Sequence, residues 1–202
     1  MTAEERTDMR DTSRPFHNAF IASLFLLLAC IGTRAQAQEG ITIQADAWGT
    51  STQLGKIFPV KISIDQLSTD EDRKVLIDAF TRSGQEGMVN ALGSMSPKGR
   101  ISLEGSTGNP VRYIRELPSN EGRRFRLVND REIFMGEMTF GARATSSQYS
   151  IGAVELTITP DGKGSGVLLP ACKLKVNKEK QIEIESYQNS WQLKNLIVTF
   201  GK

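Results

Sequence analysis

The sequence is poor in the side chains on which most enzymes and metal sites depend. Its 202 residues contain one histidine, His17, and two cysteines, Cys30 and Cys172. Aromatic residues make up only 7%, and 25 basic residues against 23 acidic ones leave a formal net charge of +2. No charge field of a single sign therefore indicates nucleic acid, an anionic membrane or an acidic substrate. Collagen-like, disulfide-scaffold and wholly disordered classes are excluded as well, which leaves one globular domain with a short appendage.

A short, uncharged apolar run occupies residues 19–31 near the N-terminus. It is too short to span a bilayer, which needs about 20 residues, and it has the length of the hydrophobic region of a signal peptide. An A-x-A motif ends at Ala37, so residues 1–37 are predicted to be a cleaved signal peptide. The alternative is a lipid anchor on Cys30, because residues 27–30 resemble a lipobox.

The predicted mature domain, residues 38–202, contains no histidine. The Ser-His-Asp triad, the Cys-His pair and the H-E-x-x-H zinc motif are therefore excluded from it. It keeps one cysteine, Cys172, so it cannot form an internal disulfide. No metal or cofactor is expected, and no transmembrane segment remains after processing. The predicted location is secreted or periplasmic, or lipid-anchored at Cys30 in the alternative case.

Alternation of apolar and polar residues predicts strands through most of this domain. Two strands come first, at 41–48 and 56–65, and the others follow Pro97, at 99–104, 110–117, 123–128, 133–140, 150–159, 164–169, 171–176, 181–187 and 192–200. Tight turns join them, which favours hairpins and an antiparallel sheet. A sheet of about ten strands has to curl or split. The predicted fold is therefore α+β, mainly antiparallel β, as a sandwich or a partly closed barrel.

One segment between the second and third predicted strands has a helical pattern. Thr69 can cap a helix, acidic residues occupy 70–72, and an apolar stripe runs to Phe80 before Gly84. A shorter helix is predicted at 85–92. We expect the two to form a short helical hairpin, inserted after the second strand and lying on the sheet.

The last predicted hairpin can be set in register from its apolar residues. Matching their faces places Leu174 opposite Ile184. The same register places two lysines opposite two glutamates, Lys175 with Glu183 and Lys173 with Glu185. Opposite charges across strands are stabilising, so ion pairing is favoured over a role for these glutamates as paired catalytic carboxylates.

Five residues are candidates for ligand binding: Arg112, Arg124, Arg126, Trp48 and Tyr113. Guanidinium groups match carboxylates and phosphates, but interleaved acidic residues favour a solvated face of mutually paired charges. Arg124 and Arg126 alternate with apolar residues, so we expect both to point to solvent.

The aromatic candidates Trp48 and Tyr113, together with Tyr149, Tyr187 and Trp191, are expected either to line a cavity or to pack in the core. Cys172 is predicted to be a small buried apolar residue without reactivity.

Several short segments of the chain resemble a family of short exported bacterial proteins. They are residues 62–65, 69–71, 111–113, 128–131, 155–156 and 161–164, within a region from Phe58 to Tyr187. The resemblance implies export and a single compact domain. The resemblance implies no particular activity and identifies no functional residues.

The absence of histidine, metal-ligand clusters and nucleophile motifs favours an exported, non-catalytic binding or envelope-associated module. Its expected partner is a small molecule, a glycan or an envelope protein, with no nucleic acid and no cofactor. The alternative is a histidine-independent hydrolase that uses paired carboxylates, for which Asp65, Glu137 and Glu183 are candidate acids.

Overall fold

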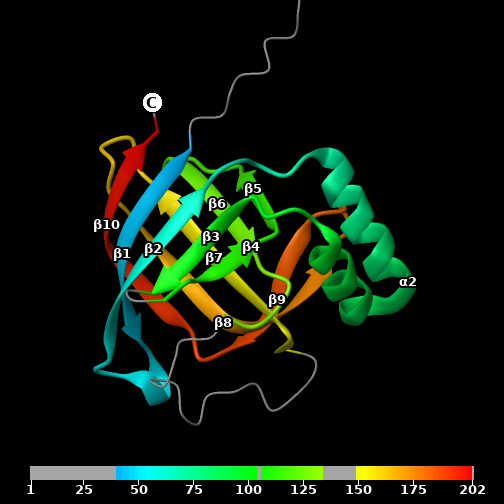
Figure 1. The fold of residues 1–202 in the computed structure, drawn as a ribbon, viewed down its shortest axis with the longest axis horizontal. Helices are drawn as coiled ribbons and strands as arrows, with labels where there is room; N and C mark the ends of the chain where they lie inside the picture. Colours follow the sequence, from blue (N-terminus) through cyan, green and yellow to red (C-terminus); the bar gives the residue numbers. More distant parts are fainter. Residues whose placement is uncertain (1–39, 104–105, 134–148, 202) are drawn as a thin grey trace, which may run out of the picture. The chain divides into compact units, whose positions relative to one another are not determined.

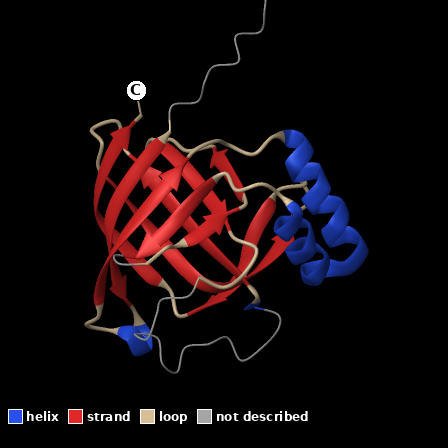
Figure 2. Ribbon diagram, in the orientation of Figure 1, coloured by secondary structure: helices blue, strands red, loops and turns tan. Residues whose placement is uncertain are grey.

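The computed structural model describes residues 40–103, 106–133 and 149–201, which lie in one compact unit, Gln38–Lys202. Within them, ten strands form a single antiparallel sheet (Figures 1 and 2). In chain order these are β1 (Ile41–Gly49), β2 (Ile57–Ile64), β3 (Gly99–Leu103), β4 (Asn109–Val111), β5 (Tyr113–Leu117), β6 (Arg123–Val128), β7 (Ile151–Ile158), β8 (Gly164–Val176), β9 (Ile182–Gln188) and β10 (Trp191–Phe200). The helical elements that accompany them are η1 (Ser51–Gln53) and α2 (Asp70–Ser94). The predicted α+β fold with a partly closed barrel is confirmed.

The sheet closes on itself almost completely. Neighbouring strands follow the order β4-β3-β2-β1-β10-β8-β7-β6-β5, and the two strands at its ends are consecutive in the chain, separated only by Arg112. β4 pairs with β3, whereas β5 pairs with β6. The Arg112 amide donates to the Val128 carbonyl at 3.1 Å. One bent stretch of chain therefore links the two ends of the sheet, and the predicted strand 110–117 is split where it changes partner.

β8 is the longest strand and has two successive neighbours along one edge. Its first part pairs with β10 and its second part with β9, while β7 lies along the other edge. Pro170 lies between these ladders, where the pairing with β7 shifts register. Proline lacks an amide hydrogen and is tolerated in a sheet at such an irregularity. The prediction of separate strands at 164–169 and 171–176 is wrong for this reason, because Pro170 interrupts pairing without ending the strand.

Apolar side chains fill the interior of the barrel. Alternation along each strand points every second residue inward, and in β1 these are Ile41, Ile43, Ala45 and Ala47. They pack with buried residues of the other strands, among them Ile62, Ile101, Phe125, Leu127, Leu156, Leu168 and Trp191. Complete burial of one such large side chain stabilises the fold by about 1.5–3 kcal/mol.

The helical insertion is a hairpin of two short helices. Thr69 Oγ1 accepts from the Asp72 amide at 3.1 Å, and the Asp72 carboxylate accepts from the Thr69 amide at 2.9 Å, a reciprocal cap that fixes the first turn. The helix breaks at Gly84, whose φ of 58° suits a residue without a side chain. A Cβ on Gly87 would lie 2.3 Å from the Ala79 carbonyl oxygen, so the second helix packs directly on the first. The predicted helical hairpin is confirmed.

A second apolar core, the outer core, lies where α2 packs against the strands (Figure 1). Its fully or almost fully buried members are Leu76, Met88, Leu92, Tyr113, Val128, Ile151, Ala153, Leu169, Cys172, Leu174 and Ile182. Burial raises the pKa of the Cys172 thiol to about 12, although the nearby Arg126 opposes the shift. The prediction that Cys172 is buried among apolar residues is confirmed.

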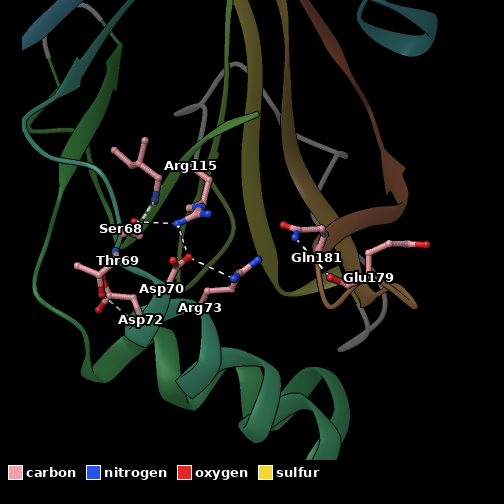
Figure 3. Close-up of polar contacts among 9 residues, drawn as sticks. Ser68, Thr69, Asp70, Asp72, Arg73, Arg115, Glu179 and Gln181 are labelled. Carbon is pink, nitrogen blue, oxygen red and sulfur yellow. Dashed lines mark hydrogen bonds and ion pairs between the residues drawn. The ribbon is translucent and has the colours of Figure 1, made fainter. Parts of the chain in front are cut away.

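Polar contacts tie the start of α2 to β5 (Figure 3). The Ile114 amide donates to Ser68 Oγ at 3.0 Å. The Asp70 carboxylate lies 3.1 Å from Arg115 Nη1 and 3.2 Å from Arg73 Nη2. The helix therefore contacts the barrel through both apolar packing and charge pairing.

The C-terminal hairpin largely follows the predicted register. Leu174 faces Ile184 and Lys175 faces Glu183. An irregularity after Lys173 places it opposite Ser186 instead of Glu185, yet its Nζ still lies 2.9 Å from Glu185 Oε2. Lys175 Nζ lies 3.6 Å from Glu183 Oε2. The predicted ion pairs are confirmed, and Glu183 and Glu185 are engaged by lysines.

Three other predictions fall on parts of the chain that the structure does not describe. They are the signal peptide with Cys30, most of the strand at 133–140, and the candidate acid Glu137.

Candidate binding cleft on the outer wall of the barrel

A cleft of about 560 Å³ opens on the outer wall of the barrel where β6, β7 and β8 are neighbours. Its lining residues come from these strands, from the turn after β5 and from the start of β10. They are Pro118, Ser119, Asn120, Glu121, Arg124, Glu155, Leu156, Thr157, Ser165, Gly166, Val167 and Gln192.

Strand pairing arranges six of the twelve lining residues, together with Arg126 beside them, in two rows. One row crosses four strands as Arg126, Glu155, Val167 and Gln192, which are successive register partners. The second row is Arg124, Thr157 and Ser165. Because side chains alternate along a strand, both rows face away from the barrel interior. The polar outer face of three central strands thus forms the floor of the cleft.

Glu155 is held between two arginines. Its Oε2 lies 2.8 Å from Arg124 Nη2, and its Oε1 lies 2.6 Å from Arg126 Nη2. Burial alone would raise the pKa of Glu155, but the hydrogen bonds and charges of the two guanidinium groups outweigh burial and lower it below its ordinary value. Glu155 is therefore a carboxylate at neutral pH.

The two arginine side chains differ in solvent exposure. The Arg126 side chain is only 10% exposed, and its Nη1 donates to the Ile182 carbonyl at the start of β9. The Arg124 side chain is 43% exposed and lines the cleft. The expectation that both point to solvent is thus wrong for Arg126, because β9 covers it. Arg126 joins distant strands, and Arg124 remains accessible to a ligand.

The other three candidate residues lie elsewhere. Arg112 Nη1 donates to the Met95 carbonyl at 2.8 Å, so Arg112 ties the end of α2 to the junction between β4 and β5. Tyr113 is 2% exposed within the outer core, where burial raises the pKa of its hydroxyl to about 12. Trp48 is 37% exposed, and Lys194 Nζ lies 5.1 Å from its ring centroid. Of the five candidates, the structure places Arg124 alone in the cleft lining.

The aromatic candidates do not gather around one cavity. Trp191 is fully buried in the barrel interior, with its ring centroid 5.2 Å from that of Phe58. Tyr113 belongs to the separate outer core. Tyr187 is 54% exposed. Core packing accounts for Trp191 and Tyr113, and neither lines the outer-wall cleft.

Sequence reasoning missed most of the cleft. The predicted pairing of arginines with interleaved acidic residues is present, since Arg123 lies 2.8 Å from Glu116 and Arg131 lies 3.0 Å from Asp130. Glu155, however, is the main partner of Arg124 and Arg126 and comes from β7. A signal for it exists in hindsight, because Glu155 is a charged residue on the outward face of a strongly apolar strand.

Among the described residues, no group of three or more His, Cys, Asp or Glu side chains is placed to hold a metal ion. In the same parts of the chain, no helix combines the length and apolar character needed to cross a bilayer.

These observations define a nearly closed antiparallel barrel with a polar cleft on its outer wall. Comparisons with protein-family models, with curated proteins and with solved structures gave no match.

Proposed function

We propose that this protein is an exported, non-catalytic binding module whose outer-wall cleft takes an uncharged, hydroxyl-rich ligand such as a glycan. The observation that carries the proposal is the accessible Arg124–Glu155 pair on the cleft floor. A sugar hydroxyl donates one hydrogen bond and accepts others, so adjacent guanidinium and carboxylate groups can engage it from both sides.

The rest of the lining has the same chemistry. Side chains with hydroxyl or amide groups surround the pair: Ser119, Asn120, Thr157, Ser165 and Gln192. Pro118 and Val167 add apolar surface against which the C–H face of a sugar ring can pack. A few polar groups in fixed positions with some apolar surface are what small-ligand sites require.

The charge balance of the lining favours a neutral ligand over an anion. It contains one arginine, Arg124, and two glutamates, Glu121 and Glu155. Because Glu155 already engages both Arg124 and Arg126, a phosphate or carboxylate ligand would compete with it for the guanidinium groups.

The expected affinity is weak for a single sugar. At about 0.3 kcal/mol per non-hydrogen atom, a monosaccharide of about 12 such atoms gains about 4 kcal/mol, which corresponds to a Kd of about 1 mM. An oligosaccharide that continues along the groove would bind more tightly.

NMR titration of the exported protein with neutral and charged saccharides tests the proposal. We expect neutral oligosaccharides to shift the amide signals of Arg124, Thr157 and Gln192. Gln192→Ala should weaken binding, whereas Gln44→Ala, a matched exposed glutamine on β1, should leave it unchanged. Shifts elsewhere only, or none with any saccharide, would refute a glycan site here.

The hydrolase alternative has one supporting observation, since Glu121 and Glu155 line the same cleft. The lowered pKa of Glu155 suits a base or nucleophile and not a proton donor, which leaves Glu121 as the acid. Turnover of a bound oligosaccharide that disappears in Glu121→Gln would establish this alternative. Binding without turnover would support the binding module.

Export is the remaining part of the proposal, and it rests on the sequence of residues 1–37. Mass spectrometry of the protein recovered from outside the cytoplasm tests it. An N-terminus at Gln38 supports a secreted or periplasmic protein, and a lipid-modified Cys30 supports the anchored form instead.

A further inference from the structure

The connection between β1 and β2 exposes an unusual share of large apolar side chains. Seven such side chains are exposed in the described residues, and three of them lie here: Trp48 at 37%, Leu54 at 82% and Ile57 at 43%. We call these three the apolar tip. Burying them would remove apolar surface from water, so their exposure marks a contact surface.

The backbone holds the apolar tip in a defined shape. Trp48 and Ile57 are direct register partners on the outer face of β1 and β2, and Leu54 lies on the turn between them. The Gly49 amide donates to the Lys56 carbonyl at 2.8 Å, and the Leu54 amide donates to the Ser51 carbonyl at 3.1 Å. These donors are satisfied within the turn, so they lose no hydrogen bonds on entering an apolar environment.

A contact to the β9–β10 turn fixes the tip further. Thr50 Oγ1 donates to the Ser190 carbonyl at 2.6 Å, which joins the two turns at this end of the barrel. The exposed Leu54 therefore lies on a turn that a hydrogen bond joins to the β9–β10 turn.

In the described part of the chain, basic side chains outnumber acidic ones around the apolar tip. Residues 47–64 and 189–201, which include both turns, contain Lys56, Lys61 and Lys194 and no aspartate or glutamate. Lys194 Nζ lies 5.1 Å from the Trp48 ring centroid. One acidic residue, Asp46, is the register partner of Lys194 on β1 and accepts a hydrogen bond from Asn195 at 2.8 Å, so three lysines stand against one carboxylate here. The near-neutral net charge of the whole protein conceals this locally basic end.

We propose that the apolar tip binds the surface of an anionic lipid bilayer, with Leu54 and Ile57 entering the headgroup layer beside Trp48. Lysines around exposed aliphatic side chains complement anionic headgroups, and tryptophan favours the membrane–water interface. A protein partner fits less well, because a stable interface needs about 800 Å² from each side and three partly exposed side chains on a turn offer little of it. The proposal is independent of the outer-wall cleft.

Vesicle sedimentation tests the proposal directly. The exported protein is prepared with Cys30→Ser, so that no lipid anchor contributes, and is mixed with vesicles of phosphatidylcholine alone or with about 30% phosphatidylglycerol. We expect binding to the anionic vesicles, weakened by salt, and a blue shift of Trp48 fluorescence on binding. Trp191 is fully buried and gives a constant background.

Substitutions then locate the contact. Leu54→Ser should lower the partition coefficient about tenfold. The matched control is Val75→Ser, because Val75 is 51% exposed on α2, and it should change nothing. Lys194→Gln should reduce the preference for anionic vesicles several-fold, whereas Lys178→Gln in the β8–β9 turn should not. Circular dichroism is expected to be unchanged in all four variants, because the substituted side chains are exposed.

Three outcomes would overturn the proposal. One is failure of the protein to sediment with anionic vesicles, and another is equal binding by Leu54→Ser and the unsubstituted tip. The third is a dimer in sedimentation velocity that Leu54→Ser dissociates, because that would assign the apolar tip to a second copy of the chain.

Discussion

The barrel interior and its outer wall bury different kinds of side chain. The interior is filled by isoleucine, leucine, valine, alanine, phenylalanine and tryptophan. The outer wall has an apolar core of its own, but charged side chains are buried around it, including Arg126 at 10% exposure and Lys98 at 7%. The interior is therefore specified by local alternation along each strand, whereas the outer wall also depends on pairs between distant strands.

This difference predicts different responses to substitution. In the interior, a shortened side chain loses transfer free energy and leaves a cavity, so the cost depends on volume. On the outer wall, loss of one charged partner leaves the other partner buried without compensation, so the cost depends on charge.

The largest effect is expected in the interior. Phe125→Ala removes a fully buried ring and should lower the free energy of unfolding by about 4 kcal/mol, measured by urea denaturation. Val75→Ala, at a half-exposed position on α2, should cost no more than about 0.5 kcal/mol. A loss below about 1 kcal/mol for Phe125→Ala would mean that the interior is loosely packed.

A smaller but still large effect is expected on the outer wall. Glu155→Gln keeps the side-chain volume and leaves Arg126 without its carboxylate, so the free energy of unfolding should fall by about 3 kcal/mol. The double variant Arg126→Met with Glu155→Leu replaces the pair by apolar groups and should be more stable than Glu155→Gln. If the double variant is less stable than Glu155→Gln, then side-chain volume and not charge determines the cost of substitution on the outer wall, as it does in the interior.

Acid should destabilise the outer wall selectively. The pKa of Glu155 is lowered in the folded state, so the unfolded chain binds its proton first as pH falls below the ordinary value of 4.5. The stability that Glu155 contributes is therefore complete above that pH and is lost as pH falls toward the folded pKa. Urea midpoints between about pH 7 and pH 3 should fall less in Glu155→Gln than in the unsubstituted protein. Asp130, whose pKa is lowered by Arg131 and Arg112 against the effect of burial, leaves a residual dependence in both.

The same difference explains how far the sequence predicts the fold. The interior-facing strands, the capped helix and most of the C-terminal register follow from patterns within single segments, and the structure confirms them except for the irregularity at Lys173. The break at Arg112 and the continuity of β8 through Pro170 were missed, because each depends on which strand lies alongside. Local alternation cannot supply that information.

The candidate site was predictable only in part, for the same reason. Arg124 is a candidate from its side-chain chemistry alone, and it does line the cleft. Its partner Glu155 is 31 residues away along the chain and meets it only through the pairing of β6 with β7. The burial of Arg126 beneath the start of β9 depends on a contact over 56 residues. Side chains that act through such distant pairing leave no signature in a single segment.

The smallest effect is expected for charge pairs that lie outside both cores. Lys173 and Glu185 form a 2.9 Å pair with exposures of 35% and 42%, so water competes with each partner and neither is left in an apolar environment when the other is removed. Glu185→Gln should therefore change the free energy of unfolding by about 0.5 kcal/mol or less, and about 0.5 M salt should abolish the change. Urea denaturation of this variant beside Glu155→Gln compares two glutamate-to-glutamine changes that differ in burial. Equal losses in the two variants would show that burial of the Arg126–Glu155 pair, and hence the distinction between the outer wall and the solvated surface, has no energetic consequence.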